Sequence, residues 1–310
     1  MAENNPFPGE NNTGHFWDDN LRELRNPAPR WWMIGFWASI LWWIGYGILF
    51  PMWPTLHGNT KGILGWSQIK EYDEGVEQVQ SLRSEYEEKL AGMTPKEIMS
   101  DPGLNQYTLA SAKVLFGDNC SACHGSGGQG NPGFPVLADD DWLYGGTTAK
   151  IGETITGGRK PSMPAHAKIL SKSDIDTLAH WVVQMSDTGG KGGSEEGWNL
   201  FRTKGCIACH GAKANGHVTD LPNGQFVTVG AANLTDGIFR FRPSGVSEDQ
   251  PLTDEQKLAS ATHTITYGVN QPGVPETRNA EMPAFGQTGK LDQQQIKKLV
   301  VYVYQLGGGQ

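Results

Sequence analysis

Two stretches, Cys120-Ser-Ala-Cys123-His124 and Cys206-Ile-Ala-Cys209-His210, repeat one five-residue motif and contain all four cysteines of the chain. Cys-x-x-Cys-His is the attachment motif of a c-type haem. Residues three and four apart share one face of a helix, so both thiols can reach two vinyl groups of one porphyrin. The histidine that follows can then point at the iron. The repeat therefore predicts two covalently bound haem c groups.

A Cys-x-x-Cys pair is also compatible with a disulfide, a zinc site or a thioredoxin-like redox pair. Zinc usually takes four ligands, which two such pairs could supply. The histidine directly after both pairs distinguishes the motif from these alternatives and favours haem.

Each motif is followed by a Met-Pro pair, Met163-Pro164 and Met282-Pro283. Methionine opposite histidine is a common axial pair in cytochromes c and raises the reduction potential. The proline favours an extended conformation of the preceding residue, which suits a loop that crosses a haem face. We predict Met163 and Met282 as the sixth ligands, although a methionine also commonly fills a core gap. Three histidines are alternative ligands: His166, His217 and His263.

Both irons would then be six-coordinate, with no open position. We therefore expect this chain to pass electrons and to carry no catalytic residue. The predicted iron ligands are His124, Met163, His210 and Met282, and the predicted haem-binding thiols are Cys120, Cys123, Cys206 and Cys209.

An uncharged run of 23 residues, WWMIGFWASILWWIGYGILFPMW, extends from Trp31 to Trp53. Such a length is sufficient to cross a hydrocarbon core of about 30 Å. Tryptophans at both ends are typical of membrane interfaces. A buried core helix and a cleaved signal peptide are the alternatives, but the run is too long for either and begins too late for a signal peptide. We predict one permanent membrane helix.

Three arginines, Arg22, Arg25 and Arg30, precede this run closely, whereas Lys61 is the only basic residue shortly after it. Positive charge favours the cytoplasmic side. In known bacterial systems, c-type haem is attached outside the cytoplasm. This agrees with an N-terminus inside the cell and haem motifs outside it. We expect a single-pass protein of the bacterial inner membrane with both haem domains in the periplasm.

The predicted fold class is mainly α, with one N-terminal transmembrane helix followed by two tandem class I cytochrome c-like haem domains. The two domains resemble each other: Glu153-Thr-Ile-Thr-Gly-Gly158 parallels His263-Thr-Ile-Thr-Tyr-Gly268. The net charge of -8 argues against nucleic-acid binding. The predicted segments are a cytoplasmic segment 1–30, a transmembrane helix 31–53, a periplasmic helical spacer 54–104, a first cytochrome c domain 105–187, a Gly-rich linker 188–194 and a second cytochrome c domain 195–310.

Helical signals also occur in the spacer and at the end of each haem domain. Thr94-Pro95-Lys96-Glu97 predicts a helix start with a capping box. The spacings Ile175-x-x-Leu178-x-x-Trp181 and Ile296-x-x-Leu299-x-x-Tyr302 predict an amphipathic helix that ends each domain.

The N-terminal part carries a more specific pattern. The stretch Trp17-Asp-Asp-Asn-Leu-Arg-Glu-Leu-Arg-Asn-Pro-Ala-Pro-Arg-Trp-Trp32 and the run Tyr46-Gly-Ile-Leu-Phe-Pro-Met-Trp-Pro54 flank the apolar helix. With the two haem motifs, they resemble the dihaem subunit family, CcoP or FixP, of cbb3-type cytochrome c oxidases. The resemblance covers nearly the whole chain.

This resemblance implies a function and partners. The chain would accept electrons from a soluble or membrane-bound cytochrome c donor. It would relay them to a monohaem cytochrome c subunit and then to the haem-copper catalytic subunit, where the complex reduces oxygen to water and pumps protons. Met163 would complete the first haem site, with Cys120, Cys123 and His124, and Met282 would complete the second.

Other functions remain open from the sequence. The chain could be the dihaem subunit of a membrane dehydrogenase or a free membrane-anchored electron shuttle. It could also be a haem-based gas sensor in which a methionine ligand is displaced. The Asn-Pro-x-Pro entry into the apolar helix favours the oxidase.

Overall fold

The computed structural model describes residues 9–17, 21–221, 226–243, 245–246 and 250–307. The chain forms two compact units, Met1–Ser84 and Glu85–Gln310. The predicted segment 1–30 therefore lies partly outside the described residues.

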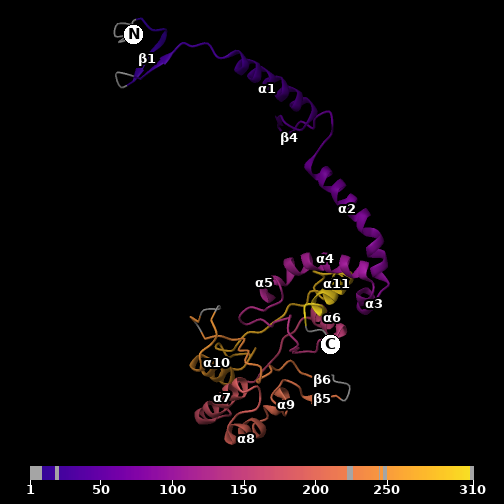
Figure 1. Ribbon diagram of the computed structural model, residues 1–310, viewed down its shortest axis with the longest axis vertical. Coiled ribbons are helices and arrows are strands. Elements are labelled where there is room, and N and C mark those ends of the chain that lie inside the picture. The colour runs from indigo at the N-terminus through magenta and orange to yellow at the C-terminus, as the bar shows by residue number, and fades with distance from the viewer. Residues whose placement is uncertain (1–8, 18–20, 222–225, 244, 247–249, 308–310) are drawn as a thin grey trace. The chain divides into compact units, whose positions relative to one another are not determined.

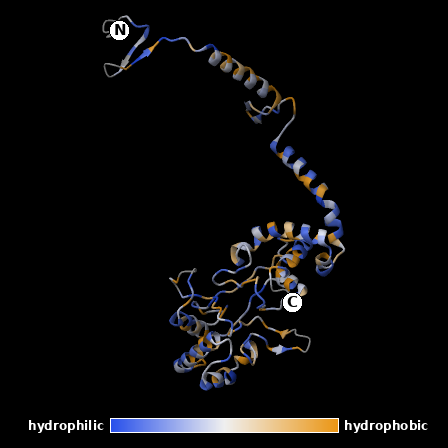
Figure 2. Cartoon of the chain, viewed as in Figure 1, coloured by the Kyte–Doolittle hydropathy of each residue, from blue (hydrophilic) through white to orange (hydrophobic). Residues whose placement is uncertain are grey.

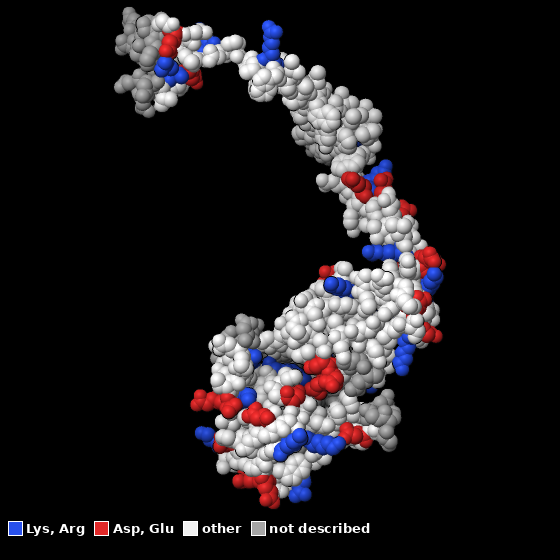
Figure 3. Space-filling model, viewed as in Figure 1, with Lys and Arg blue, Asp and Glu red and all other residues white. Residues whose placement is uncertain are grey.

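The first unit contains one long apolar helix, α1 (Arg30–Leu49). Its 20 residues span about 30 Å at 1.5 Å per residue, so it is long and apolar enough to cross a membrane. Beyond Arg30, α1 shows no charged side chain on the visible face (Figure 3) and no blue, hydrophilic residue (Figure 2). The helix ends at Leu49 and not at Trp53, because Phe50 precedes Pro51 and is extended, with φ -113° and ψ 161°.

Small hairpins flank α1 that the mainly helical prediction did not include. Strand β1 (Asn12–Trp17) pairs with β2 (Leu21–Leu24) before the helix, and β3 (Pro54–Thr55) pairs with β4 (Gly58–Asn59) after it. The chain after α1 folds back on it, since Ile63 N–H donates to Ile48 O at 3.0 Å. The Trp43 and Trp53 rings also meet edge to face at 4.8 Å.

The predicted spacer contains two helices, α2 (Gln68–Ala91) and α3 (Pro95–Ser100). The predicted capping box at Thr94 is confirmed: its side chain accepts from Glu97 N–H, and Glu97 accepts from Thr94 N–H. The end of the spacer belongs to the second unit, where Leu90 and Ile98 share a buried cluster with Leu104 and Val301. Within that unit Lys298 also forms an ion pair with Glu87.

The second unit holds both haem motifs and is mainly helical (Figure 1). Its remaining helices and strands are α4 (Pro102–Asn119), α5 (Ser121–His124), α6 (Thr148–Gly157), α7 (Lys172–Asp187), α8 (Glu195–Thr203), α9 (Ile207–His210), β5 (Thr219–Asp220), β6 (Phe226–Val227), α10 (Asp254–Tyr267) and α11 (Gln293–Tyr304). The two amphipathic helices predicted from Ile175 and Ile296 are α7 and α11.

The helices of this unit pack into two cores, and each core draws on both sequence copies. In one, α11 packs against α4 and α6, with Phe116, Ile155 and Leu299 buried together. In the other, α7 packs against α8 and α10, and Trp181 stacks near Phe201 with 4.6 Å between ring centroids. The C-terminal helix of each copy therefore packs with the first helix of the other copy (Figure 1).

The Gly-rich linker 188–194 is a tight reversal between α7 and α8. Gly190 N–H donates to Met185 O at 2.8 Å, and Ser194 N–H donates to the Gln184 side chain at 3.1 Å. A Cβ on Gly193 would lie 2.5 Å from the Trp181 indole nitrogen. The glycines of this linker permit its close packing on α7.

Two short backbone bridges join the copies. Arg159 and Met282 exchange N–H···O bonds of 2.9 and 2.8 Å, and Met163 and Val269 exchange bonds of 3.1 and 2.9 Å. Each bridge starts just after a helix that ends in a glycine, Gly158 after α6 and Gly268 after α10. These two glycines have φ +67° and +69°, and a Cβ there would lie 2.4 Å from Met282 O or 2.3 Å from Met163 O. The bridges therefore occupy equivalent positions and require glycine.

We expect Gly158→Ala to lower the thermal midpoint of the full chain, measured by circular dichroism. Left-handed backbone costs a non-glycine residue about 1–2 kcal/mol, and the clash with Met282 O adds to this. Gly117→Ala is the matched control: Gly117 lies on the exposed face of α4, an added methyl group would meet nothing within 4 Å, and alanine there should stabilise by about 0.5–1 kcal/mol. An unchanged midpoint for Gly158→Ala would contradict the close approach of the two copies.

Candidate haem sites

The first haem motif lies at the end of α4. Cys120 is the C-cap of that helix, and α5 continues as a single turn in which His124 N–H donates to Cys120 O at 2.9 Å. Gly125, with φ +77°, ends the turn in a conformation that glycine adopts readily. The turn brings Cys120, Cys123 and His124 to the wall of one cavity, as the motif predicted.

The His124 ring is oriented by a backbone carbonyl. Its Nδ1–H donates to Pro135 O at 2.9 Å, and the side chain is buried. Burial lowers the pKa of His124, although the bond to Pro135 opposes this shift. A neutral imidazole with Nδ1 protonated leaves Nε2 free to bind a metal.

The second haem motif repeats this arrangement. In α9, His210 N–H donates to Cys206 O at 3.0 Å, and Gly211 ends the turn with φ +78°. His210 Nδ1–H donates to Ala232 O at 2.9 Å. Burial lowers the pKa of His210 as well. Both copies therefore present an imidazole in the same tautomer.

The cysteines lie in surroundings unlike those of a redox pair. Burial raises the pKa of Cys120 to about 11, and burial also raises the pKa of Cys206. Reactive dithiols instead have a lowered thiol pKa. Within the described part of the chain, no group of three or more His, Cys, Asp or Glu side chains is placed to hold a metal ion. The raised thiol pKa values weigh against the redox alternative.

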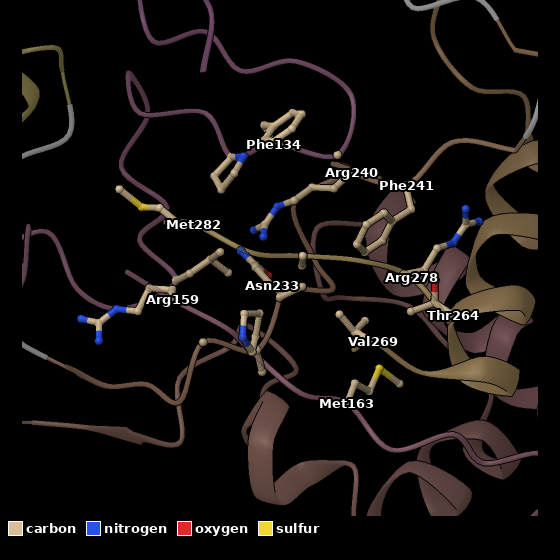
Figure 4. Close-up of a pocket in the computed structure, with 18 of the residues that line it drawn as sticks. Phe134, Arg159, Met163, Asn233, Arg240, Phe241, Thr264, Val269, Arg278 and Met282 are labelled. Atoms are coloured by element: carbon tan, nitrogen blue, oxygen red, sulfur yellow. The ribbon is translucent and has the colours of Figure 1, made fainter. Parts of the chain in front are cut away.

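The two predicted methionines lie with the opposite haem motifs from those expected. Met282 packs against the core cluster that includes Cys120 and Phe116. The segment after Met163 pairs with α10, where His166 N–H donates to Ile265 O at 3.1 Å, and Ile265 packs on the cluster of Cys206. Figure 4 shows the two methionines at separate ends of the cavity. The fold therefore brings each predicted methionine to the half that holds the motif of the other copy, and the assignment of the sixth ligands stays a prediction.

The backbone bridges are the physical reason for this exchange. After α6 the chain leaves its own copy at Gly158, and the Met-Pro segment of the other copy occupies the space beside Arg159. After α10 the chain likewise leaves its own copy at Gly268, and the Met163-Pro164 segment of the first copy occupies the space beside Val269. Each methionine is thus carried to the core of the other copy.

The three alternative histidine ligands have different surroundings. His263 Nε2 donates to Glu276 O at 2.7 Å, and the His217 ring stacks on Phe226 with centroids 3.7 Å apart. Both are engaged in local contacts. His166 lines the cavity, and its buried Nδ1 has no hydrogen-bond partner among the described residues. His166 occupies the position of Phe285 in the other copy, three residues after the methionine.

One cavity of about 1490 Å³ joins both sites. It exceeds the roughly 300–1,000 Å³ of an ordinary small-ligand pocket. Both motifs and both methionines line it, among apolar groups such as Leu178 and Leu299. Each half of the cavity therefore offers two thiols, an oriented neutral imidazole, a thioether and an apolar wall. This combination suits a covalently attached haem.

The cavity also contains charged groups that the sequence did not single out. Arg159 lies over the Tyr144 ring at 4.5 Å, and Arg278 lies over the Phe241 ring at 5.4 Å. Arg240 also lines the cavity, near Asp141 and Asp236. Burial, with the neighbouring Asp141, raises the pKa of Asp236 to about 7, and the bond from Ile238 N–H opposes this. No motif marks these positions, because they are scattered along the chain.

Three family models match the chain in consecutive regions. Residues 9–57 match the N-terminal domain of cytochrome oxidase-cbb3, FixP. Residues 108–182 match cytochrome c oxidase, cbb3-type, subunit III, and residues 194–307 match cytochrome c. The two haem-bearing regions are therefore cytochrome c-type domains, as expected.

Curated relatives match along the whole chain. A cbb3-type cytochrome c oxidase subunit FixP of Azorhizobium caulinodans is 38% identical and covers 97% of this chain and 94% of its own length. A FixP subunit of a Bradyrhizobium species is 36% identical, over 99% of this chain and 98% of its own length. A CcoP subunit of an Azospirillum species is 34% identical over 100% of both chains. The resemblance found in the sequence is confirmed, and this chain belongs to the FixP/CcoP family of cbb3-type cytochrome c oxidase subunits.

Proposed function

We propose that this chain is a membrane-anchored dihaem cytochrome c that carries electrons into a cbb3-type oxidase. One observation carries the proposal: two equivalent half-sites each combine a Cys-x-x-Cys-His turn, an Nδ1–H donated to a backbone carbonyl, and a methionine. When bound, each haem supplies an iron that gains and loses one electron. The chain's residues attach it, orient it and exclude water.

The geometry supports one set of iron ligands in each half. His124 and Met282 would bind the haem attached at Cys120 and Cys123. His210 and Met163 would bind the haem attached at Cys206 and Cys209. Pro135 O and Ala232 O would hold the two imidazoles in the required tautomer.

A haem with both axial positions filled transfers electrons but binds no oxygen. Methionine ligation raises its reduction potential, which suits an acceptor for a cytochrome c donor. We therefore assign this chain a relay function within the oxidase, without an oxygen-reducing site of its own.

Family membership supports the partners. The chain would take electrons from a cytochrome c donor and pass them to a monohaem cytochrome c subunit and the haem-copper subunit. The match of residues 9–57 to the FixP N-terminal domain favours this function over a dehydrogenase subunit or a free shuttle. We place α1 in the bacterial inner membrane, with the arginine-rich side in the cytoplasm and both haems in the periplasm.

The exchanged methionines can be tested with double variants of the full chain. We expect His124→Ala/Met282→Ala to leave one intact His–Met haem, because both changes fall in one site. His124→Ala/Met163→Ala should leave none, because each site loses a ligand. The methionine-to-iron absorption band of the oxidised protein measures the outcome.

A reciprocal set on His210→Ala, combined with Met163→Ala or Met282→Ala, should give the mirrored result. Covalent haem content, measured as the pyridine haemochrome, controls for incomplete haem attachment. Retention of the band in His124→Ala/Met163→Ala would contradict the exchanged pairing.

Purification in mild detergent tests the function itself. We expect the chain to co-purify with a haem-copper subunit and oxygen-consuming activity, and the isolated reduced chain to show no spectral change with carbon monoxide. Recovery with a dehydrogenase and without oxidase activity would favour the alternative. A carbon monoxide complex of the isolated chain would show an open iron position and would contradict a pure relay.

A further inference from the structure

Arg240 lies at the junction between the two halves of the cavity, one with the motif of His124 and the other with the motif of His210. Its backbone carbonyl accepts a 2.6 Å hydrogen bond from Gly133 N–H, which belongs to the loop that orients His124. The next residue, Phe241, accepts a bond from Ser260 of α10 in the other half. The Arg240 side chain points into the cavity, between the ends that hold the two methionines (Figure 4).

The Arg240 guanidinium has no direct partner within the described part of the chain. Among the described residues, no hydrogen bond from its nitrogens and no carboxylate oxygen within 4.0 Å is present. Burial lowers the pKa of this guanidinium, which still remains charged in a protein. A charge removed from water without a partner is costly. Its five N–H donors are suited to carboxylates, which they bind in pairs.

The nearby acidic groups come from both copies but bind elsewhere. Asp139, Asp141 and Tyr144 approach Arg240 from one copy, and Asp236 approaches from the other. Asp139 accepts a bond from Asp141 N–H at 3.3 Å, and Asp236 accepts one from Ile238 N–H at 2.9 Å. These carboxylates therefore lie near the guanidinium, while oxygens of Asp139 and Asp236 accept bonds from backbone N–H groups.

The other two arginines of the cavity each belong to one half. Arg159, beside Met282, donates from Nε to Thr154 at 2.9 Å and from Nη1 to Glu153 at 3.0 Å. Arg278 lies beside Val269, the bridge partner of Met163. Arg240, in contrast, is faced by ionisable groups of both copies.

Building on the proposed dihaem function, we propose that Arg240 is a carboxylate-binding residue shared by the two sites. It binds propionate carboxylates of the haems and raises the reduction potential of both. Each propionate is a carboxylate that remains on a covalently attached haem. A fixed positive charge disfavours the oxidised iron, which carries one more positive charge than the reduced iron, and the low dielectric of the cavity strengthens this effect.

Redox titration of the full chain, followed optically, tests the inference. We expect Arg240→Gln to lower both midpoint potentials, each by about a tenfold change in the oxidised-to-reduced equilibrium, or about 59 mV for one electron. Arg240→Lys retains the charge and should give a smaller shift, which provides a second measurement if Arg240→Gln folds poorly.

Three matched variants locate the effect. Arg159→Gln should shift mainly the haem with His124 and Met282, and Arg278→Gln mainly the haem with His210 and Met163. Arg202→Gln removes the same charge from the exposed surface of α8 and should shift neither.

Two outcomes separate this inference from the proposed function. If both covalent haems and their His–Met spectra are present but Arg240→Gln shifts only one potential or neither, Arg240 is not a shared residue. If the unaltered chain carries fewer than two such haems, the proposed function itself fails.

Discussion

The second unit depends on two backbone bridges, Arg159 with Met282 and Met163 with Val269. Each is a pair of N–H···O bonds made possible by a glycine that has no side chain to keep the other copy away. A net contribution of about 1 kcal/mol per hydrogen bond is modest. Their importance lies in their position, because they hold each Met-Pro segment beside the other copy. The helical cores follow the same exchange, with α11 on α4 and α7 on α8.

This exchange explains why one cavity joins both sites. If the helices of each copy packed only with one another, we would expect two separate haem pockets in two domains joined only by the linker. Here the chain crosses between halves at Gly158 and again at Gly268, so groups from both copies meet at the junction. Arg240 is faced there by Asp141 of one copy and Asp236 of the other. Under our proposal, a single charge in such a position acts on both haem sites, whereas Arg159 and Arg278 act on one site each.

Local signals in the sequence predict the helices of the second unit well. The capping box at Thr94, the amphipathic spacing in α7 and α11, and the turns at both Cys-x-x-Cys-His motifs all depend on residues close in the chain. The apolar run continues to Trp53, whereas α1 ends at Leu49, shortly before Pro51. The methionine pairing could not be predicted, because both copies carry the same Met-Pro signal and neither segment contains a feature that excludes the other haem. Arg240 and its carboxylates come together only through the fold.

Because of the exchange, the two sequence copies do not correspond to two separate structural domains in this chain. Residues 105–187 and 195–310 each contain a complete set of cytochrome c signals, yet each core needs helices from both. Under the proposed ligand sets, each His–Met pair takes its methionine from the other copy. In that proposal, an iron site at one motif depends on the folding of the other copy. The tight reversal at 188–194, packed on Trp181, joins the two copies directly without a free linker.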